Sequence, residues 1–150
     1  TTARAVGKAM SRVMTDAEVD AFLDSKPGWI ALSSLDARGY PHTVPLGYYR
    51  RGDDLVMGVK DDTAKVRNIE RDGRVSAMLE SGTSGADIKG VLIRGRARVV
   101  RDPEELLMLM REGARRRGVP EAELPTSPRP GSVYIRLKRE RLVSWDYSSS

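Results

Sequence analysis

Six segments of the chain have the apolar alternation or the β-branched content of strands, and short turns join most of them. The segments cover residues 29–35, 41–50, 55–59, 75–80, 88–100 and 132–146. The turns between the first three contain the glycine and aspartate that hairpins favour. Strands joined by hairpins pair antiparallel. The pattern therefore predicts a mainly β (α+β) protein, a six-stranded antiparallel barrel with short helices on its outside or ends.

Three short helices are predicted, one before the first strand and two between later strands. The first follows a capping box at residues 15–18, in which a Thr oxygen accepts from a helix N–H and a Glu reaches back. The second lies within residues 60–74, and the third begins at Asp102, followed by Pro at the first helical position. Residues 1–14 form a basic arm that we expect to be flexible. A chain of 150 residues suits one domain, predicted to span residues 15–150.

The predicted strand at residues 41–50 has an unusual composition. Pro41 and Pro45 cannot donate hydrogen bonds to a neighbouring strand, so at least part of this strand is expected at a sheet edge or facing something other than a neighbouring strand. Gly47 lacks a side chain, so a flat ligand could approach the backbone closely there. The strand is therefore a candidate for binding a planar group through its backbone.

The helix predicted within residues 60–74 has features of an anion site. Thr63 or Asp62 can cap its first turn, and Gly73 follows its last helical position, where glycine favours a left-handed stop. Val66 and Ile69 share one face, which we expect to be buried. Lys65 lies in the first turn, where a lysine opposes the helix dipole unless it serves an anion. The alternative is a solvated surface helix with ordinary charges.

Composition narrows the possible chemistry. The chain has no cysteine and one histidine, His42, so no thiol nucleophile is available and no metal site is predicted. We find no nucleophile elbow and no glycine-rich phosphate loop. The net charge is +5, but acidic residues are interleaved with the basic ones, which favours a small anionic ligand over nucleic acid. No membrane-spanning run or signal peptide is recognised, so we expect no membrane partner and a cytoplasmic location.

Three motifs in the same order and spacing resemble the pyridoxamine 5′-phosphate oxidase-like split β-barrel superfamily. Residues 39–46 (Gly-Tyr-Pro-His-Thr-Val-Pro-Leu) resemble its strand entry, and residues 63–69 with 72–76 are similar to its phosphate-binding helix and following strand. Residues 91–97 (Val-Leu-Ile-Arg-Gly-Arg-Ala) are similar to a third strand motif. Within the superfamily, the sequence at Lys65, Arg67 and Asn68 looks most like the actinobacterial flavin/deazaflavin oxidoreductases.

This resemblance implies a homodimer that binds the deazaflavin coenzyme F-420, or in some cases FMN, in a groove between subunits. It implies that Lys65 meets the cofactor phosphate. A larger set of residues would contact the cofactor around it: Thr63, Arg67 and Asn68 beside the phosphate, Val44, Pro45 and Leu46 along the ring, and Lys60 and the partner subunit's Lys89 as weaker candidates.

The implied activity is hydride transfer from reduced F-420 to an electron-poor organic substrate, such as an enone, a quinone or a tetrapyrrole-like compound. The catalytic residues are unknown, since a proton could come from solvent, Tyr48, Tyr49 or His42. FMN-type oxidases have a basic residue just before the phosphate lysine, whereas this chain has Ala64, which favours F-420. An FMN-dependent oxidoreductase and a non-catalytic flavin- or deazaflavin-binding protein remain alternatives. Residues 81–86 and 118–130 are the loops expected near the substrate.

Overall fold

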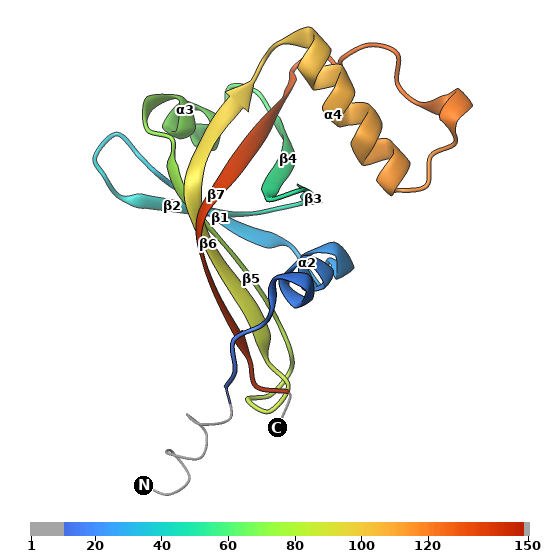
Figure 1. Cartoon of the computed structure of the whole chain (residues 1–150). Helices are drawn as coiled ribbons and strands as arrows, with labels where there is room; N and C mark the ends of the chain where they lie inside the picture. The colour runs from blue at the N-terminus through green and yellow to red at the C-terminus, as the bar shows by residue number, and fades with distance from the viewer. Residues whose placement is uncertain (1–10, 149–150) are drawn as a thin grey trace, which may run out of the picture.

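The computed structural model describes residues 11–148, which form one antiparallel sheet with three α-helices and a short 3-10 turn (Figure 1). The strands are β1 (Ile30–Leu35), β2 (Pro41–Leu46), β3 (Tyr49–Arg51), β4 (Asp54–Lys60), β5 (Arg74–Ser81), β6 (Lys89–Val100) and β7 (Ser132–Asp146). The helices are α2 (Asp16–Ser25), α3 (Ala64–Arg71) and α4 (Pro103–Arg116), followed by η1 (Glu121–Glu123). The strand order is β2-β1-β5-β6-β7-β4-β3. The prediction of a mainly β antiparallel fold with short helices is confirmed.

The described chain has seven strands, so the prediction of six is wrong, because residues 41–50 do not form one strand. The strand breaks at Gly47 and Tyr48. On one side of the break β2 pairs with β1, and on the other side β3 pairs with β4, at the opposite end of the sheet. Hydrogen bonds therefore do not close the described sheet into a barrel. The expectation that Pro41 and Pro45 lie on an edge strand is confirmed, since β2 is the first strand of the sheet.

Two apolar clusters lie on opposite faces of this sheet. The larger one fills the concave face and includes Leu23 of α2 and Val66 and Ile69 of α3, all with at most 3% of their surface exposed. Complete burial of an aliphatic side chain of this size stabilises the fold by about 1.5–3 kcal/mol. The smaller cluster packs α4 against the outer face of β3, β4 and β6. Its members are Tyr49, Val56, Val100, Leu106 and Leu109.

Helix α2 begins with the predicted capping box. The Thr15 hydroxyl accepts from the Glu18 N–H at 3.2 Å, and the Glu18 carboxylate accepts from the Thr15 N–H at 3.0 Å. The guanidinium of Arg12 and the backbone of Thr15 hold the pKa of Glu18 at about 2. The backbone of Arg12 also pairs with that of Asp146 on β7. Residues 1–10 of the predicted flexible arm lie outside the described residues.

Helix α3 ends differently from the prediction. Its C-cap Asp72 is extended, with φ −148°, and Gly73 has no positive φ, so the expected left-handed stop is wrong. Gly73 has a different role: a Cβ there would lie 2.7 Å from the Ala97 carbonyl oxygen. The Ala97 N–H donates to the Gly73 carbonyl at 2.7 Å. Glycine is required here because the backbone of β6 passes too close for a side chain.

Candidate functional site

The break between β2 and β3 leaves a split in the described sheet. β4 pairs with β7 along its whole length, but with β3 only as far as Val56. If that ladder continued, Gly47 would lie opposite Gly58 and Leu46 opposite Val59. Because β2 pairs with β1 instead, two strand edges have no partner within residues 11–148: the edge of residues 57–60 of β4 that faces away from β7, and the outer edge of β2. Unpaired strand edges offer backbone donors and acceptors to a ligand.

Three of the predicted cofactor residues lie on one of these edges. Val44, Pro45 and Leu46 form the second half of β2 and lie opposite Leu32, Ala31 and Ile30 of β1. Pro45 is exposed on the outer face, while Val44 and Leu46 are partly buried on the opposite face. The placement leaves their outer backbone edge available for a planar group.

The N-terminus of α3 follows the other edge directly. β4 ends at Lys60, and α3 begins four residues later at Ala64. The Thr63 hydroxyl donates to the Lys60 carbonyl at 3.2 Å, and no side chain caps the first turn of α3. Lys65, in that turn, is partly buried and has no ion-pair partner among residues 11–148. Uncapped N–H groups beside an unpaired lysine are the features that bind a phosphate.

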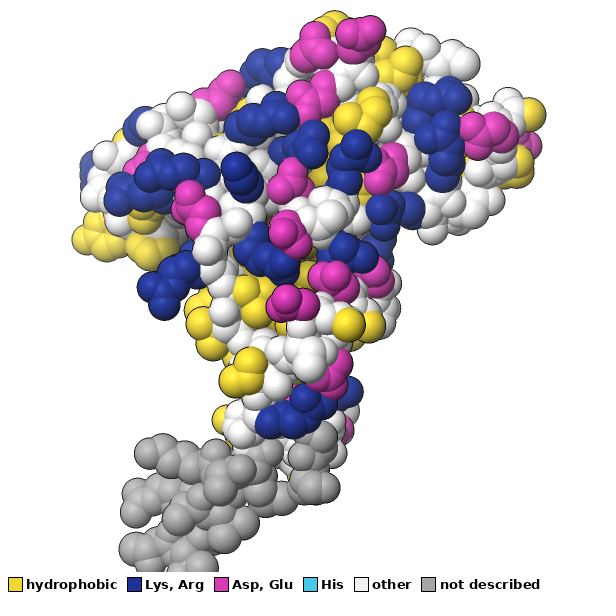
Figure 2. Space-filling model, in the orientation of Figure 1, with side chains coloured by type: hydrophobic (Ala, Val, Ile, Leu, Met, Phe, Trp, Pro, Cys, Tyr) yellow, Lys and Arg dark blue, Asp and Glu magenta, His cyan; other side chains and the backbone are white. Residues whose placement is uncertain are grey.

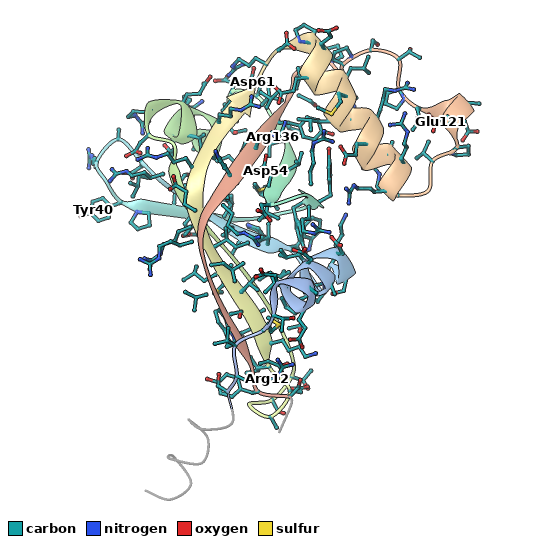
Figure 3. The ribbon with its side chains drawn as sticks, viewed as in Figure 1. Arg12, Tyr40, Asp54, Asp61, Glu121 and Arg136 are labelled. Atoms are coloured by element: carbon teal, nitrogen blue, oxygen red, sulfur yellow. The ribbon has the colours of Figure 1, made fainter. Side chains whose placement is uncertain are left out.

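The two aspartates before α3 are both paired with arginines. Asp61, visible at the end of β4 in Figure 3, accepts from Arg101 at 2.7 and 2.9 Å. These bonds, with one from the Asp62 N–H, hold the pKa of Asp61 below its ordinary value. Asp62 accepts from Arg67 at 2.9 Å. Neither carboxylate therefore pairs with Lys65, although Arg67 is partly engaged.

Asn68 and Lys89 lie away from the phosphate end of the split. Asn68 is 4% exposed, and its amide donates to the Ser34 hydroxyl at 3.2 Å beneath α3. Lys89 is the first residue of β6, whereas α3 adjoins β6 near Ala97. Eight residues of strand separate Lys89 from Ala97, about 26 Å at about 3.3 Å per residue. One chain therefore does not bring Lys89 to α3.

The structure separates the three candidate proton donors. The Tyr48 hydroxyl donates to the Leu23 carbonyl, and the Tyr49 hydroxyl donates to the Leu109 carbonyl at 2.7 Å. Burial raises the pKa of Tyr48 to about 12 and raises that of Tyr49 as well. Both tyrosines therefore act as packing residues in this structure. His42 differs, because its buried Nδ1 has no hydrogen-bond partner in the described part of the chain.

Two hollows open at the split and under α4. The first, about 460 Å³, contains Gly47, Gly58 and the exposed Trp29, and the second, about 760 Å³, contains Lys60. These sizes are typical of small-molecule sites. Residues of the 118–130 loop line the second hollow, whereas residues 81–86 line neither. Trp29, Arg117 and Tyr134 were not assigned to a site from the sequence, since their convergence depends on the tertiary fold.

Residues 11–148 contain no group of three or more acidic, histidine or cysteine side chains that could hold a metal ion. In the same residues no helix has the length and apolar content to cross a membrane. Figure 2 shows basic and acidic side chains interleaved on the face that it displays.

Comparison with known proteins identifies the family to which the chain belongs. The sequence profile of a family described as pyridoxamine 5′-phosphate oxidase matches residues 15–145. The chain belongs to the pyridoxamine 5′-phosphate oxidase family. This family comprises flavin-dependent oxidoreductases. No curated protein matches the chain in a sequence search.

Several solved structures resemble the chain over most of its length. A conserved hypothetical protein from Mycobacterium tuberculosis matches with a TM-score of 0.78 and 26% identity, over 91% of this chain and 88% of that one. An F-420 reductase matches with a TM-score of 0.61 and 18% identity, over 81% and 93%. An FAD-binding protein from Mesorhizobium loti matches with a TM-score of 0.67 and 18% identity, over 91% and 97%. At 18% identity, the last two matches show a similar fold and no more than that.

The split fits a planar cofactor that carries a phosphate. Among residues 11–148, two unpaired backbone edges flank it. The uncapped first turn of α3 and Lys65 stand at its end. Among the predicted residues, Lys60, Thr63 and Lys65 are brought together there, with Arg67 close by in the same turn of helix.

Proposed function

We propose that the protein is an oxidoreductase that uses coenzyme F-420 to transfer a hydride to an electron-poor organic substrate, such as an enone, a quinone or a tetrapyrrole-like compound. The observation that carries the proposal is the uncapped N-terminus of α3, with unpaired Lys65, at the end of two unpaired strand edges. Family membership supports an oxidoreductase, and an F-420 reductase shares the fold.

In this proposal, the residues of the chain bind the cofactor and orient it. Lys65 and the first-turn N–H groups of α3 hold the phosphate, with Thr63 and Lys60 beside it. The backbone of Val44, Pro45 and Leu46 aligns the ring, and Arg67 and Asn68 support the helix that carries Lys65. The bound cofactor supplies the hydride chemistry. A protein that binds and a cofactor that reacts are consistent with the small number of acid–base side chains at the split.

FMN is the second candidate cofactor, and an FMN-dependent oxidoreductase or a non-catalytic binding protein would share the same site. Ala64 favours F-420, since a second cation is missing beside Lys65.

The test of the cofactor is a titration of the purified protein with F-420 and with FMN, in which binding is followed by the fluorescence of each cofactor. We expect F-420 to bind more tightly. Micromolar binding of FMN without binding of F-420 would refute the choice, and tight binding without turnover by any reductant would indicate a non-catalytic role.

Lys65 is the residue that most directly tests the phosphate site. Lys65→Ala should weaken cofactor binding by about 1.5–3 kcal/mol, the range for hydrogen bonds to charged groups, or roughly 10- to 150-fold in Kd. Lys138→Ala is the matched control, because Lys138 also has no ion-pair partner among residues 11–148 but lies on β7 opposite Asp54. An equal effect of the two substitutions would show that net charge, not the α3 site, determines affinity.

We also propose a homodimer with the cofactor groove at the subunit interface. Five apolar residues lie in register across the outer face of five neighbouring strands, and three of them are exposed. The row consists of Pro45, Ala31, Met78, Leu92 and Val143. A second copy covering this row would remove it from water and would allow Lys89 of the partner subunit to reach the groove. Sedimentation velocity tests this: a monomer at every concentration would contradict it.

A further inference from the structure

The two hollows adjoin one another beneath α4 and share three of their lining residues. Gly58, Arg117 and Tyr134 line both of them. Lys65 and the first turn of α3 line neither. The joined space therefore lies beside the proposed cofactor site without including its phosphate end. It is large enough for a second small molecule.

Within the described part of the chain, the basic residues of this space lack the ion pairs that are common elsewhere. Arg115 pairs with Glu121 at 2.8 Å, and Arg116 pairs with Glu112 at 3.1 Å. Glu121 lies on the turn after α4 (Figure 3). Arg117, the next residue, has no acidic partner among residues 11–148 and instead lines both hollows.

Three further cations line the space, and none of them has an ion-pair partner in the described chain. Lys26 lies in the first hollow, and Lys60 and Arg129 lie in the second. Burial and the nearby charges of Arg116 and Arg117 lower the pKa of Lys26. Glu123 is the acid that lines these walls. Four cations against one carboxylate make the space electropositive, and low-dielectric walls strengthen that field.

Two aromatic rings, those of Trp29 and Tyr134, also line this space. The Trp29 ring passes over Gly47, where a Cβ would lie 3.4 Å from it. The Tyr134 ring passes over Gly58, where a Cβ would lie 3.2 Å away. Trp29 is 73% exposed, so its ring face is available. Aromatic rings stack offset on planar conjugated molecules.

We propose that the joined hollows bind a planar conjugated molecule that carries a carboxylate. Its ring system packs between Trp29 and Tyr134, and its carboxylate is held by Arg117, with Arg129 beside it. Arginine suits this task because its guanidinium pairs with a carboxylate through two parallel hydrogen bonds. Because the space adjoins the split at Gly58, we identify this molecule as the hydride acceptor. That identification rests on the proposed function. The binding site itself requires no cofactor.

The test uses pyrene-1-carboxylate as the probe and the neutral pyrene-1-carboxamide as its matched analogue. Binding to the full chain is followed by pyrene fluorescence without any cofactor. We expect the carboxylate to bind at least tenfold more tightly than the amide. Arg117→Gln should lower carboxylate affinity roughly 10- to 150-fold, as for hydrogen bonds between charged groups, and leave amide affinity unchanged. Arg115→Gln, whose arginine is already paired with Glu121, should change neither.

A second variant tests the location independently of charge. Gly58→Val places methyl groups against the Tyr134 ring where the hollows join, and should weaken both probes. Equal affinity for acid and amide, or equal effects of Arg117→Gln and Arg115→Gln, would overturn the inference.

The F-420 titration is a separate measurement, which distinguishes failure of this inference from failure of the proposed function. Loss of F-420 binding with probe binding retained would overturn the acceptor role alone, whereas F-420 binding without probe binding would overturn the site alone.

Discussion

Replacing Asn68 with alanine distinguishes a supporting role from direct cofactor contact. The resemblance assigned Asn68 to the phosphate, but the structure buries it beneath α3 with its amide on the Ser34 hydroxyl. Asn68→Ala removes this hydrogen bond and leaves Ser34, which is 3% exposed, without its donor. We therefore expect the main effect on stability.

The expected magnitude follows from the two groups involved. A hydrogen bond contributes about 1 kcal/mol net, and a buried polar group left without its partner costs about 1–3 kcal/mol. A loss of roughly 2–4 kcal/mol in the free energy of unfolding is therefore expected. For a domain of this size each kcal/mol lowers Tm by about 2–4 °C, so the melting temperature should fall by about 4–16 °C.

Urea denaturation followed by circular dichroism measures the effect. Ser34→Ala should also destabilise the protein, and the double variant should be less destabilised than the sum by about 0.5–1.5 kcal/mol, because neither residue then leaves the other unpaired. The reasoning fails if Asn68→Ala unfolds at the wild-type urea midpoint while cofactor affinity falls. That result would show that the amide faces the cofactor.

Two further predictions concern Tyr48 and Gly73. Because burial raises the pKa of Tyr48 to about 12 from the ordinary 10.0, its contribution to stability is full below pH 10 and is lost as the pH rises through 12. Tyr48→Phe should reduce this alkaline decline in denaturation midpoints, and an unchanged decline would contradict the assignment. Gly73→Ala and Gly73→Asn should both destabilise by about 1–3 kcal/mol, because the obstacle is the Ala97 carbonyl. Better tolerance of asparagine would indicate a left-handed backbone instead.

Local patterns predicted much of the fold. Period-two alternation identified β6, where Val91 and Ile93 are buried and Arg94 and Arg96 are exposed. The capping box predicted the start of α2, since both of its hydrogen bonds join residues three apart. These features depend on neighbours along the chain, so the sequence alone specifies them.

Features that depend on distant partners were not predicted. The apolar pattern continues through Tyr48 and Tyr49, so nothing local marks the break at Gly47 that creates the split. That break arises because β1 pairs with one half of the segment and β4 with the other. For the same reason Trp29 and Arg117, far apart in sequence, were not expected in one hollow.

The strand order also has a consequence for how the protein forms during synthesis. β7, the last strand, lies between β6 and β4, so the β3–β4 hairpin has no partner in the sheet until residues 132–146 have left the ribosome. Until then β1, β2, β5 and β6 can pair with one another, but the facing edges of β6 and β4 stay open. Such edges recruit other chains. The nascent protein is therefore most vulnerable to aggregation just before β7 emerges.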